Sequence, residues 1–535
     1  MRLKSPLIHS PRSLIPALLA LIGIGAFHGG YPSLVEAAES TRKGADVQEK
    51  ATANQPNILI ILADDFGWGD ASCNNADTPL KTPAIDRIAN EGIRFTNAQT
   101  PSAVCAPTRY GLLTGRYPWR SYLKQRVLSG YSPALIREGR TTIPSYLGSQ
   151  GYRTAGFGKW HLGMDWTPVE GDPENWKSHW KSRDAKTIIQ VGTGIDHSKP
   201  FKNAPVDIGF DTYFGTPSNC TRLPFFFEDN RVVGNPRPDK SGQMRDPDCA
   251  RDKVDDIYVA KAITFIEEHE ENHSDLPFFV YLPLNAIHGA VSVPERFAGK
   301  SDLAMREDKI LWMNESVGKM LAAIDRLELD DDTLVIFTAD NGPVNSPNAR
   351  EKGHLGAGPY RGFKTNVWDG GTRVPFLVRW PGHIQAGGVT DNLIGLTDVL
   401  ATLADICGAP LPEDAAPDSI SRLASLLQDK DNIEERPALV TASNFGFFAI
   451  RKGQWKAIVG TKWSGGIYGS PKNTYGSKPP KGTPADAPDI GQLYDLSTDP
   501  FEQDDLWEQR PEVVKSLLSE LEEIKQLDEG DEFPW

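Results

Sequence analysis

The sequence predicts an α/β protein built on a large mixed, mostly parallel β-sheet with helices on both faces, plus a smaller C-terminal antiparallel sheet with a helix. Continuous apolar runs at residues 57–63, 276–282 and 333–338 are typical of strands buried on both faces of a sheet. Segments with helical spacing of apolar residues alternate with these runs, which indicates crossover helices. Short alternating segments without helices between them predict the C-terminal sheet.

Caps, turn residues and apolar spacing give the order of the elements. Thr82 and Pro83 are typical of a helix start, because proline needs no backbone hydrogen bond in the first turn. In the main part we expect strands at 57–63, 93–96, 152–157, 276–282, 333–338 and 376–380, and helices at 82–89, 141–147, 310–327 and 398–407. In the last part we expect strands at 438–443, 447–451 and 455–459 and a closing amphipathic helix at 511–524.

Residues 165–253 have poor periodicity and are rich in large rings. They include Trp166, Trp176, His179, Trp180 and His197. Because loop regions of this length in a compact domain usually serve a function, we expect an insertion that shapes a substrate cleft, with rings that can stack on sugars.

Length and composition restrict the class of protein. The 535 residues can bury one large core and a smaller one. Hydrophobic content of 39% and charged content of 24% are typical of a soluble globular protein. The net charge of -14 argues against general nucleic-acid binding, where a basic field supplies most of the affinity. An anionic substrate would need a locally positive pocket instead.

The N-terminal segment is typical of a signal peptide. Basic residues precede an apolar run at 14–27, which is short for a membrane span, and Val35-Glu36-Ala37 offers a cleavage site. We expect an exported protein without a stable membrane anchor, periplasmic or secreted, or lysosomal or extracellular in a eukaryote; an anchor is the less favoured alternative. The expected divisions are a signal peptide at 1–37, a linker at 38–55, a catalytic domain at 56–408 and a C-terminal subdomain at 409–535.

The cysteine count is odd. Of the five, Cys105 is the natural unpaired one in an exported protein. Cys220 and Cys249 flank a loop-rich stretch and can pair with each other, but other pairings are equally open, and a free buried thiol is the alternative at each cysteine.

Oxygen-bearing side chains follow two predicted strands. Asp64 and Asp65 come directly after 57–63, and Asp340 and Asn341 come shortly after 333–338. Open α/β sheets bind ligands at the carboxyl ends of their strands. Four hard oxygen donors there favour Ca²⁺ or Mg²⁺ over zinc. A solvated acidic turn is the alternative for either pair alone.

Cys105-Ala106-Pro107-Thr108-Arg109 precedes a helix expected from near Thr108 to Thr114. Cys105 would then lie at the helix N-terminus, where free N–H groups favour an anion, and Arg109 would direct its guanidinium to the same place. A buried, inert thiol is the alternative for an isolated cysteine. Farther along, Lys159 and His161 would share one face in a strand-like register.

Together these motifs resemble the type I, formylglycine-dependent sulfatases, which are arylsulfatase-like enzymes with an alkaline-phosphatase-like fold. The resemblance rests on the Cys-x-Pro-x-Arg pattern with Leu113-Thr114-Gly115-Arg116, on residues 158–163, on residues 362–375 and on residues 493–502. It implies that a formylglycine-generating enzyme converts Cys105 to formylglycine, whose hydrated aldehyde is the nucleophile. Asp369 stands where glutamate is common, which is a conservative departure.

The same resemblance implies a role for each site residue. The metal, Ca²⁺ or Mg²⁺, would be held by Asp64, Asp65, Cys105, Asp340 and Asn341. The catalytic group would comprise Cys105, Arg109, Lys159, His161, His288 and Lys364. In this set the lysines bind sulfate, Arg109 orients the hydrated aldehyde, His161 deprotonates its second hydroxyl, and His288 protonates the leaving oxygen. Gly289-Ala290 follows His288, whereas the family often has proline two residues after this histidine, a departure that bears on the orientation of His288.

These expectations converge on a sulfuric ester hydrolase that removes sulfate from a sulfated sugar or polysaccharide. Two alternatives remain. One is a phosphatase or phosphodiesterase of the alkaline-phosphatase-like superfamily, although those enzymes use serine or threonine with zinc. The other is a non-catalytic binder of sulfated glycans, which applies if Cys105 stays a thiol.

Overall fold

The computed structural model describes residues 55–170, 191–463, 465 and 490–527. The expected signal peptide lies outside these residues, as do Trp176, His179 and Trp180. The described residues belong to one compact unit, which runs from Ala51 to the end of the chain. None of its described helices combines the length and the apolar character that crossing a membrane requires.

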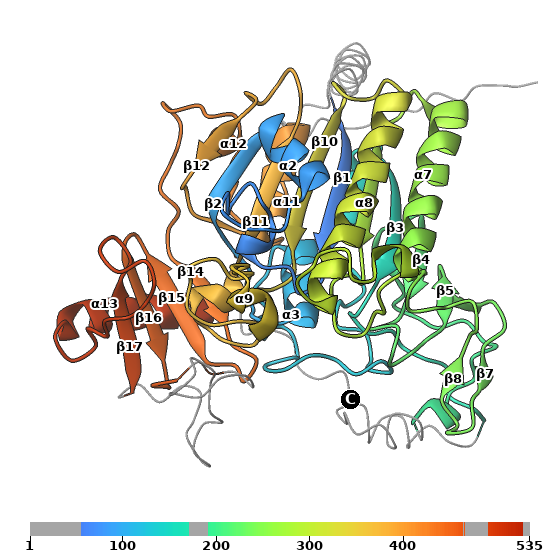
Figure 1. The fold of residues 1–535 in the computed structure, drawn as a ribbon, viewed down its shortest axis with the longest axis horizontal. Helices are drawn as coiled ribbons and strands as arrows, with labels where there is room; N and C mark the ends of the chain where they lie inside the picture. The colour runs from blue at the N-terminus through green and yellow to red at the C-terminus, as the bar shows by residue number, and fades with distance from the viewer. Residues whose placement is uncertain (1–54, 171–190, 464, 466–489, 528–535) are drawn as a thin grey trace, which may run out of the picture. The chain divides into compact units, whose positions relative to one another are not determined.

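In the described part of the chain the larger sheet contains eleven strands (Figure 1). Their order is β12-β2-β11-β10-β1-β9-β3-β4-β5-β6, with β13 beside β2. The strands are β1 (Asn57–Ala63), β2 (Ile93–Gln99), β3 (Arg153–Lys159), β4 (Thr212–Thr216), β5 (Phe226–Glu228), β6 (Arg231–Val233), β9 (Phe278–Pro283), β10 (Thr333–Ala339), β11 (Arg373–Arg379), β12 (Gly388–Thr390) and β13 (Ile394–Gly395). The centre is parallel, and β11 runs antiparallel to both of its neighbours.

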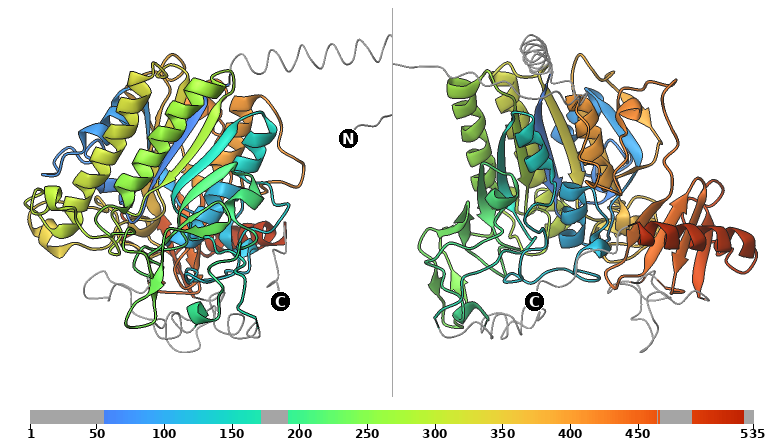
Figure 2. Two further views of the ribbon diagram at one scale, coloured as in Figure 1. Left: turned by 90° about the vertical axis from the view of Figure 1, so that its right-hand side faces the viewer. Right: turned by 180° about the vertical axis from the view of Figure 1, so that it is seen from behind.

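Helices cover both faces of this sheet (Figure 2). One group contains α2 (Pro83–Asn90), α7 (Val254–His273) and α8 (Met305–Arg326), and the other contains α3 (Cys105–Thr114), α4 (Ile143–Ser149) and α11 (Val399–Cys407). Every residue of β1 is buried because helices lie above and below it, which explains its uninterrupted apolar sequence. The predicted α/β class is confirmed.

A four-stranded antiparallel sheet and one helix form the C-terminal part (Figure 1). They are β14 (Leu439–Ala442), β15 (Phe448–Lys452), β16 (Trp455–Val459), β17 (Gly491–Asp495) and α13 (Pro511–Gln526). Val514, Leu517 and Leu521 recur at helical spacing along α13 and are buried in the core shared with the sheet. The sequence prediction included all of these elements except β17.

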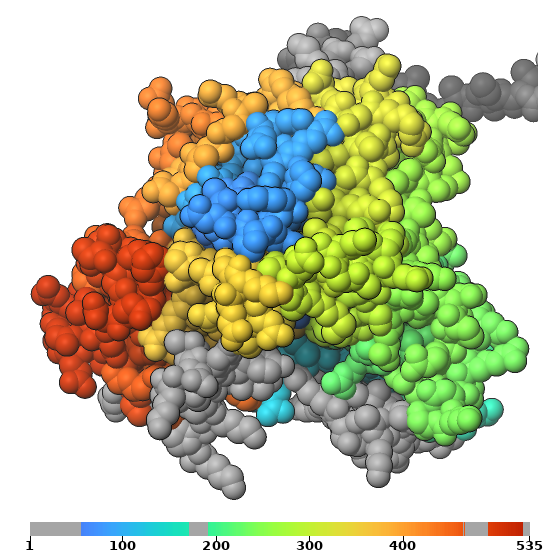
Figure 3. Space-filling view, viewed as in Figure 1, coloured from blue at the N-terminus to red at the C-terminus, as the bar shows by residue number. Residues whose placement is uncertain are grey.

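Buried charges join the C-terminal sheet to the larger domain. Lys456 of β16 lies 2.6 Å from Asp369 Oδ1 and 2.7 Å from Glu502 Oε1, while Arg373 binds the second oxygen of Asp369 at 2.6 Å. In Figure 3 the red and orange surface of this sheet directly adjoins the gold surface of the segment after β10. Asp369 therefore links the C-terminal sheet to the larger domain through ion pairs and does not face the predicted active site.

The stretch at 165–253 is more regular than its sequence indicates. β4, β5 and β6 extend the main sheet, and β7 (Arg237–Pro238) and β8 (Met244–Arg245) form a separate ribbon. These strands are too short for periodicity to reveal them. Trp166 is buried against Tyr131 and Phe201, so it belongs to the core and is not exposed for stacking on a sugar.

Short helices complete the described structure. They are α9 (Pro347–Glu351), α10 (Asp369–Thr372), α12 (Leu423–Leu426) and the 3₁₀ turns η1 (Trp68–Asp70), η2 (Pro118–Arg120), η3 (Pro205–Ile208), η4 (Glu295–Phe297) and η5 (Leu396–Asp398).

Candidate active site

Four parallel strands end at the same edge of the main sheet and bring distant residues together. β10, β1, β9 and β3 are neighbours in that order, and Ala63 of β1 is in register with Ala339 of β10. The residues that follow, Asp64 and Asp340, therefore become neighbours. The carboxyl ends of β9 and β3 add the segments that carry His288 and His161 at the same edge.

Helix α3 begins at Cys105 itself, three residues earlier than predicted. Val104 is the extended N-cap and Gly115, with a φ of 61°, ends the helix. Pro107 occupies the third helical position, which it tolerates because first-turn N–H groups have no intrahelical acceptor. Cys105 thus lies in the first turn rather than before it, and it is buried.

His161 contacts the Cys105 sulfur. Its Nδ1 lies 3.3 Å from Cys105 Sγ, and its Nε2 lies 3.2 Å from the carbonyl oxygen of Leu128. A carbonyl can only accept, so Nε2 carries the proton and Nδ1 presents a lone pair to Cys105. Strand β3 ends at Lys159 and His161 has a φ of 59°, so a left-handed turn, not strand alternation, brings the His161 side chain to the site.

Two lysines approach the paired aspartates. Lys159 Nζ lies 2.5 Å from Asp64 Oδ2, and Lys364 Nζ contacts Asp65 Oδ1. Asp65 has a φ of 65°, a left-handed conformation that turns the chain sharply after β1. Asn341 Nδ2 donates to Asp65 Oδ1 at 2.9 Å. The two residue pairs that the sequence predicts at the ends of β1 and β10, Asp64-Asp65 and Asp340-Asn341, therefore lie in one cluster.

Arg109 binds Asp340 rather than the sulfur. Its Nε and Nη2 donate to Asp340 Oδ2 at 3.0 and 2.7 Å, and its Nη1 donates to the carbonyl oxygen of Lys159 at 2.7 Å. It also lies 3.7 Å from Asp64 Oδ2. The guanidinium therefore holds α3, β3 and β10 together beneath Cys105.

Burial and neighbouring charges shift the pKa values of Asp64, Asp340 and Cys105. Burial tends to raise the pKa of Asp64, but Lys159, His288 and Arg109 outweigh burial and hold this pKa well below its usual range. Burial and the Asp64 charge raise the pKa of Asp340 to about 6. Burial also raises the pKa of the Cys105 thiol, so unmodified Cys105 is a protonated, weak nucleophile near neutral pH.

The pKa values of both histidines at the site are lowered. Burial, with Lys159 and Arg109 nearby, lowers the pKa of His161 well below its ordinary value. Burial and then Lys364 lower the pKa of His288 to about 4. Both imidazoles are therefore neutral near neutral pH in the free protein.

The donor set suits a hard divalent cation. The ligand atoms of Asp64, Cys105 and Asp340 lie within 4.8 Å of one another, as do those of Asp64, Asp65 and His288. Asp64 Oδ1 and Asn341 Oδ1 are buried and accept no hydrogen bond from the described residues. Burying such acceptors without a partner costs about 1–3 kcal/mol each, and a cation would satisfy both.

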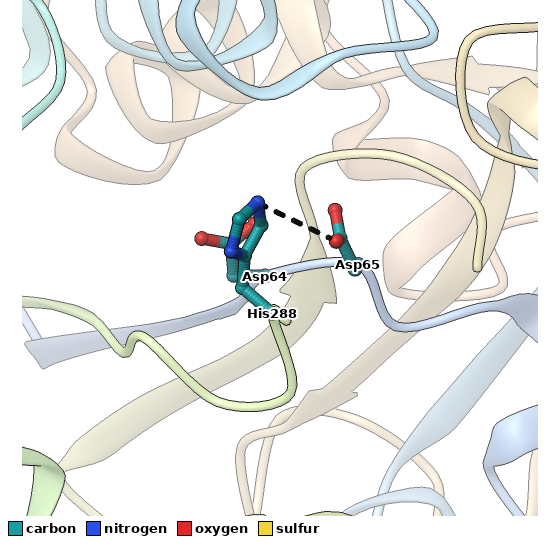
Figure 4. A group of neighbouring side chains, drawn as sticks. All are labelled: Asp64, Asp65 and His288. Atoms are coloured by element: carbon teal, nitrogen blue, oxygen red, sulfur yellow. Dashed lines mark ion pairs between the residues drawn. The ribbon is translucent and has the colours of Figure 1, made fainter. Parts of the chain in front are cut away.

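His288 lies at the opening of this group. Its Nδ1 accepts a hydrogen bond from Ala290 N at 2.9 Å, so Nε2 carries the proton, and Nε2 lies 3.8 Å from Asp65 Oδ2 (Figure 4). The side chain is 21% exposed, unlike the buried aspartates. The backbone bond from Ala290 orients the imidazole without the proline that the resemblance led us to expect.

A cavity of about 380 Å³ opens on these residues. Cys105, His161, His288 and Lys364 line it together with residues that sequence reasoning missed, among them Asn219, Arg222 and Asn444. Asn219 Oδ1 and Asn444 Nδ2 are buried without a hydrogen-bond partner in the described structure. They escaped notice because asparagines in irregular loops carry no periodic signal, and only the fold brings the β14–β15 turn to Cys105.

The other cysteines take no part in this site. Cys73, Cys220, Cys249 and Cys407 are free, so the pairing that had been left open for Cys220 and Cys249 does not occur in the described structure.

Comparison with known proteins gives consistent matches. Residues 56–409 match the family model described as Sulfatase. The N-acetylgalactosamine-6-O-sulfatase of Bacteroides thetaiotaomicron is 35% identical over 528 residues, which cover 88% of this chain and 94% of that protein. Human steryl-sulfatase is 30% identical, covering 75% of each chain. A structure solved in work on glycosaminoglycan metabolism by B. thetaiotaomicron is 33% identical, with a TM-score of 0.73, and covers 88% of this chain and all of that one.

Proposed function

The chain belongs to the sulfatase family and is a sulfate ester hydrolase, and from that premise we propose that it removes sulfate from a sulfated sugar by means of formylglycine and a divalent metal ion. The observation that carries the proposal is the gathering of Cys105, Asp64 and Asp340 within 4.8 Å, together with two buried oxygens, of Asp64 and Asn341, that accept no hydrogen bond from any described residue. A thiol among carboxylates has little structural use. A nucleophile beside a metal ion explains both the location of Cys105 among carboxylates and the two buried oxygens.

The metal ligands would be Asp64, Asp65, Asp340 and Asn341, with the modified residue 105. Oxygen donors favour Ca²⁺, and Mg²⁺ is the alternative. Such an ion supplies a Lewis acid that polarises the sulfate oxygens and the nucleophile. Arg109 supports this group by holding Asp340 in place with two hydrogen bonds.

Conversion of Cys105 to formylglycine would supply a hydrated aldehyde with two hydroxyl groups. One hydroxyl would attack sulfur and displace the alcohol, and deprotonation of the other would expel sulfate and restore the aldehyde. His161 would take a proton from the second hydroxyl, a role supported by its Nδ1 lone pair, which faces the side chain of residue 105 at 3.3 Å. The lowered pKa of His161 keeps it unprotonated before that step.

Lys159 and Lys364 would bind sulfate oxygens, since each ammonium already lies beside the carboxylates of the proposed metal site. Fixed cations aimed at the charge that develops in the transition state are an effective source of rate enhancement. His288 would protonate the leaving oxygen through Nε2. A bound sulfate brings negative charge close to that atom, which favours the imidazolium that this role requires.

The sugar portion of the substrate would occupy the rest of the cavity. Asn219 Oδ1 offers an acceptor and Asn444 Nδ2 a donor, and sugar hydroxyls can satisfy both. The relative named N-acetylgalactosamine-6-O-sulfatase, which is similar over most of its length, supports a sulfated amino sugar.

Residues 1–37 would direct export, 38–55 would form a linker, and 56–408 and 409–535 would be the catalytic domain and C-terminal subdomain.

The decisive experiment measures desulfation by the exported protein across defined sulfated monosaccharides, beginning with N-acetylgalactosamine 6-sulfate. Aryl sulfate and aryl phosphate are assayed in parallel with Ca²⁺, Mg²⁺ or Zn²⁺. Peptide mass spectrometry of residue 105 reads the modification directly. Preference for aryl phosphate with zinc, or an intact thiol with binding but no turnover, would refute the proposal.

A further inference from the structure

The first turn of α7 contains a buried carboxylate that the proposed mechanism does not use. Asp255 is 1% exposed and accepts hydrogen bonds from two consecutive backbone N–H groups, that of Asn285 to Oδ1 at 2.8 Å and that of Ala286 to Oδ2 at 2.7 Å. Both carboxylate oxygens therefore bind the segment that follows β9. The two N–H groups bind different oxygens, and a carboxamide would replace one of these acceptors by an NH2 donor.

The segment held by Asp255 is also tied to Asp64. Asp64 N donates to Ala286 O at 3.0 Å, and Ile287 N donates to Asp64 O at 2.8 Å. His288 N donates to Asn285 O at 3.1 Å and so begins the turn that presents the imidazole. The position of His288 relative to the proposed metal site thus depends on a short backbone stretch fixed by Asp64 on one side and Asp255 on the other.

The same turn of α7 reaches the segment that carries the second histidine. Tyr258 OH accepts a hydrogen bond from Asn285 Nδ2 at 3.4 Å and donates to Thr216 Oγ1 at 3.1 Å. Next to Thr216, the carbonyl oxygen of Pro217 accepts from His161 N at 3.1 Å. Asp255 and Tyr258 therefore support both segments from behind the cavity.

We propose that Asp255 is a positioning residue for sulfate ester hydrolysis, which acts by fixing the backbone at residues 285–286 and thereby the place of His288 beside Asp65. The inference rests on the role proposed above for His288. A carboxylate in the first turn of a helix also stabilises that helix, so the test must separate positioning from stability.

The test compares Asp255→Asn with Asp256→Asn in the full-length protein, using a sulfated monosaccharide that the wild-type protein hydrolyses. Asp256 is the matched control, because it is adjacent, has the same side chain and pairs with Arg296 at a surface site 27% exposed. We expect Asp255→Asn to lower kcat by about tenfold or more, with little change in KM, since displacing a catalytic group costs turnover. Asp256→Asn should retain near wild-type kcat.

Combining each change with His288→Ala distinguishes positioning from general damage. If Asp255 acts through His288, the effect of Asp255→Asn on kcat should shrink to about twofold or less in the His288→Ala background. Equal losses in both backgrounds, or wild-type kcat in a folded Asp255→Asn variant, would overturn the inference.

Should Asp255→Asn fail to fold, Tyr258→Phe replaces it. This variant loses the hydroxyl that links Asn285 to Thr216, and it should lower kcat by about two- to fivefold with the same dependence on His288. Additive losses for this variant would also overturn the inference. A wild-type protein that hydrolyses no sulfate ester refutes the proposed function and this inference together, whereas additive losses in an active protein refute only the inference.

Discussion

Replacing Lys456 by methionine tests whether buried charge joins the C-terminal sheet to the domain that carries the site. Lys456 is 3% exposed and bridges Asp369 Oδ1 and Glu502 Oε1 at 2.6 and 2.7 Å. Methionine has a similar length and apolar stem but no charge. The change would leave two buried carboxylates facing each other, with Arg373 as the remaining cation bound to Asp369.

The expected loss is about 3 kcal/mol of unfolding free energy. Removing one partner of a buried ion pair typically costs about 3–5 kcal/mol. Two contacts favour the lower end, because Arg373 still neutralises Asp369 at 2.6 Å and Asp369 N still donates to Glu502 Oε2 at 2.7 Å. Burial already raises the pKa of Glu502, so protonation of Glu502 further limits the loss.

The assay is urea unfolding at neutral pH, followed by tryptophan fluorescence. Lys452→Met is the matched control, since Lys452 lies on the neighbouring strand, is 56% exposed and pairs with Glu520 at 2.8 Å. An exposed pair contributes about 0–1 kcal/mol, so this variant should unfold close to wild type. If Lys456→Met is no less stable than Lys452→Met, the buried cluster does not stabilise the fold and the reasoning is wrong.

Three further predictions concern the site. Cys105→Ala should lower aryl sulfate turnover at least about a thousandfold at a near wild-type melting temperature, and turnover within tenfold of wild type would contradict a nucleophile at residue 105. Ca²⁺ at about 100 times its Kd should add about 2.7 kcal/mol to the unfolding free energy, and Asn341→Ala should lose most of that gain in calcium-dependent thermal melts. Burial, with Asp256 and Asp64 nearby, raises the pKa of Asp255 to about 7. Its contribution to stability should therefore be full below about pH 4 and fall as pH rises to about 7, by up to about 1.4 kcal/mol per unit. Asp255→Asn should lack this slope in unfolding titrations, and an unchanged slope would count against the assignment.

The sequence alone determined the elements whose local pattern is strong. The apolar run at 57–63 is β1 to the residue, since a strand buried on both faces can contain almost no polar side chain. The same logic located β9 and β10, whereas short alternating segments without helices between them located β14, β15 and β16. The prediction that Cys105, Asp64, Asp65, Asp340 and Lys364 would gather came from separate motifs in a familiar order, and the parallel register of β1 and β10 brings the aspartates together.

Only the tertiary structure decided which partner each charge meets. Arg109 binds Asp340, and Asp369 binds Lys456, because long-range packing determines which oppositely charged groups are buried together. No local rule predicts the left-handed turn that directs His161 to Cys105. No sequence pattern identifies Asp255 as a positioning residue, because its partners are backbone N–H groups thirty residues away and such donors are present in every sequence. Periodicity records which face of an element is buried, whereas the identity of the group that meets a buried charge depends on how whole elements pack.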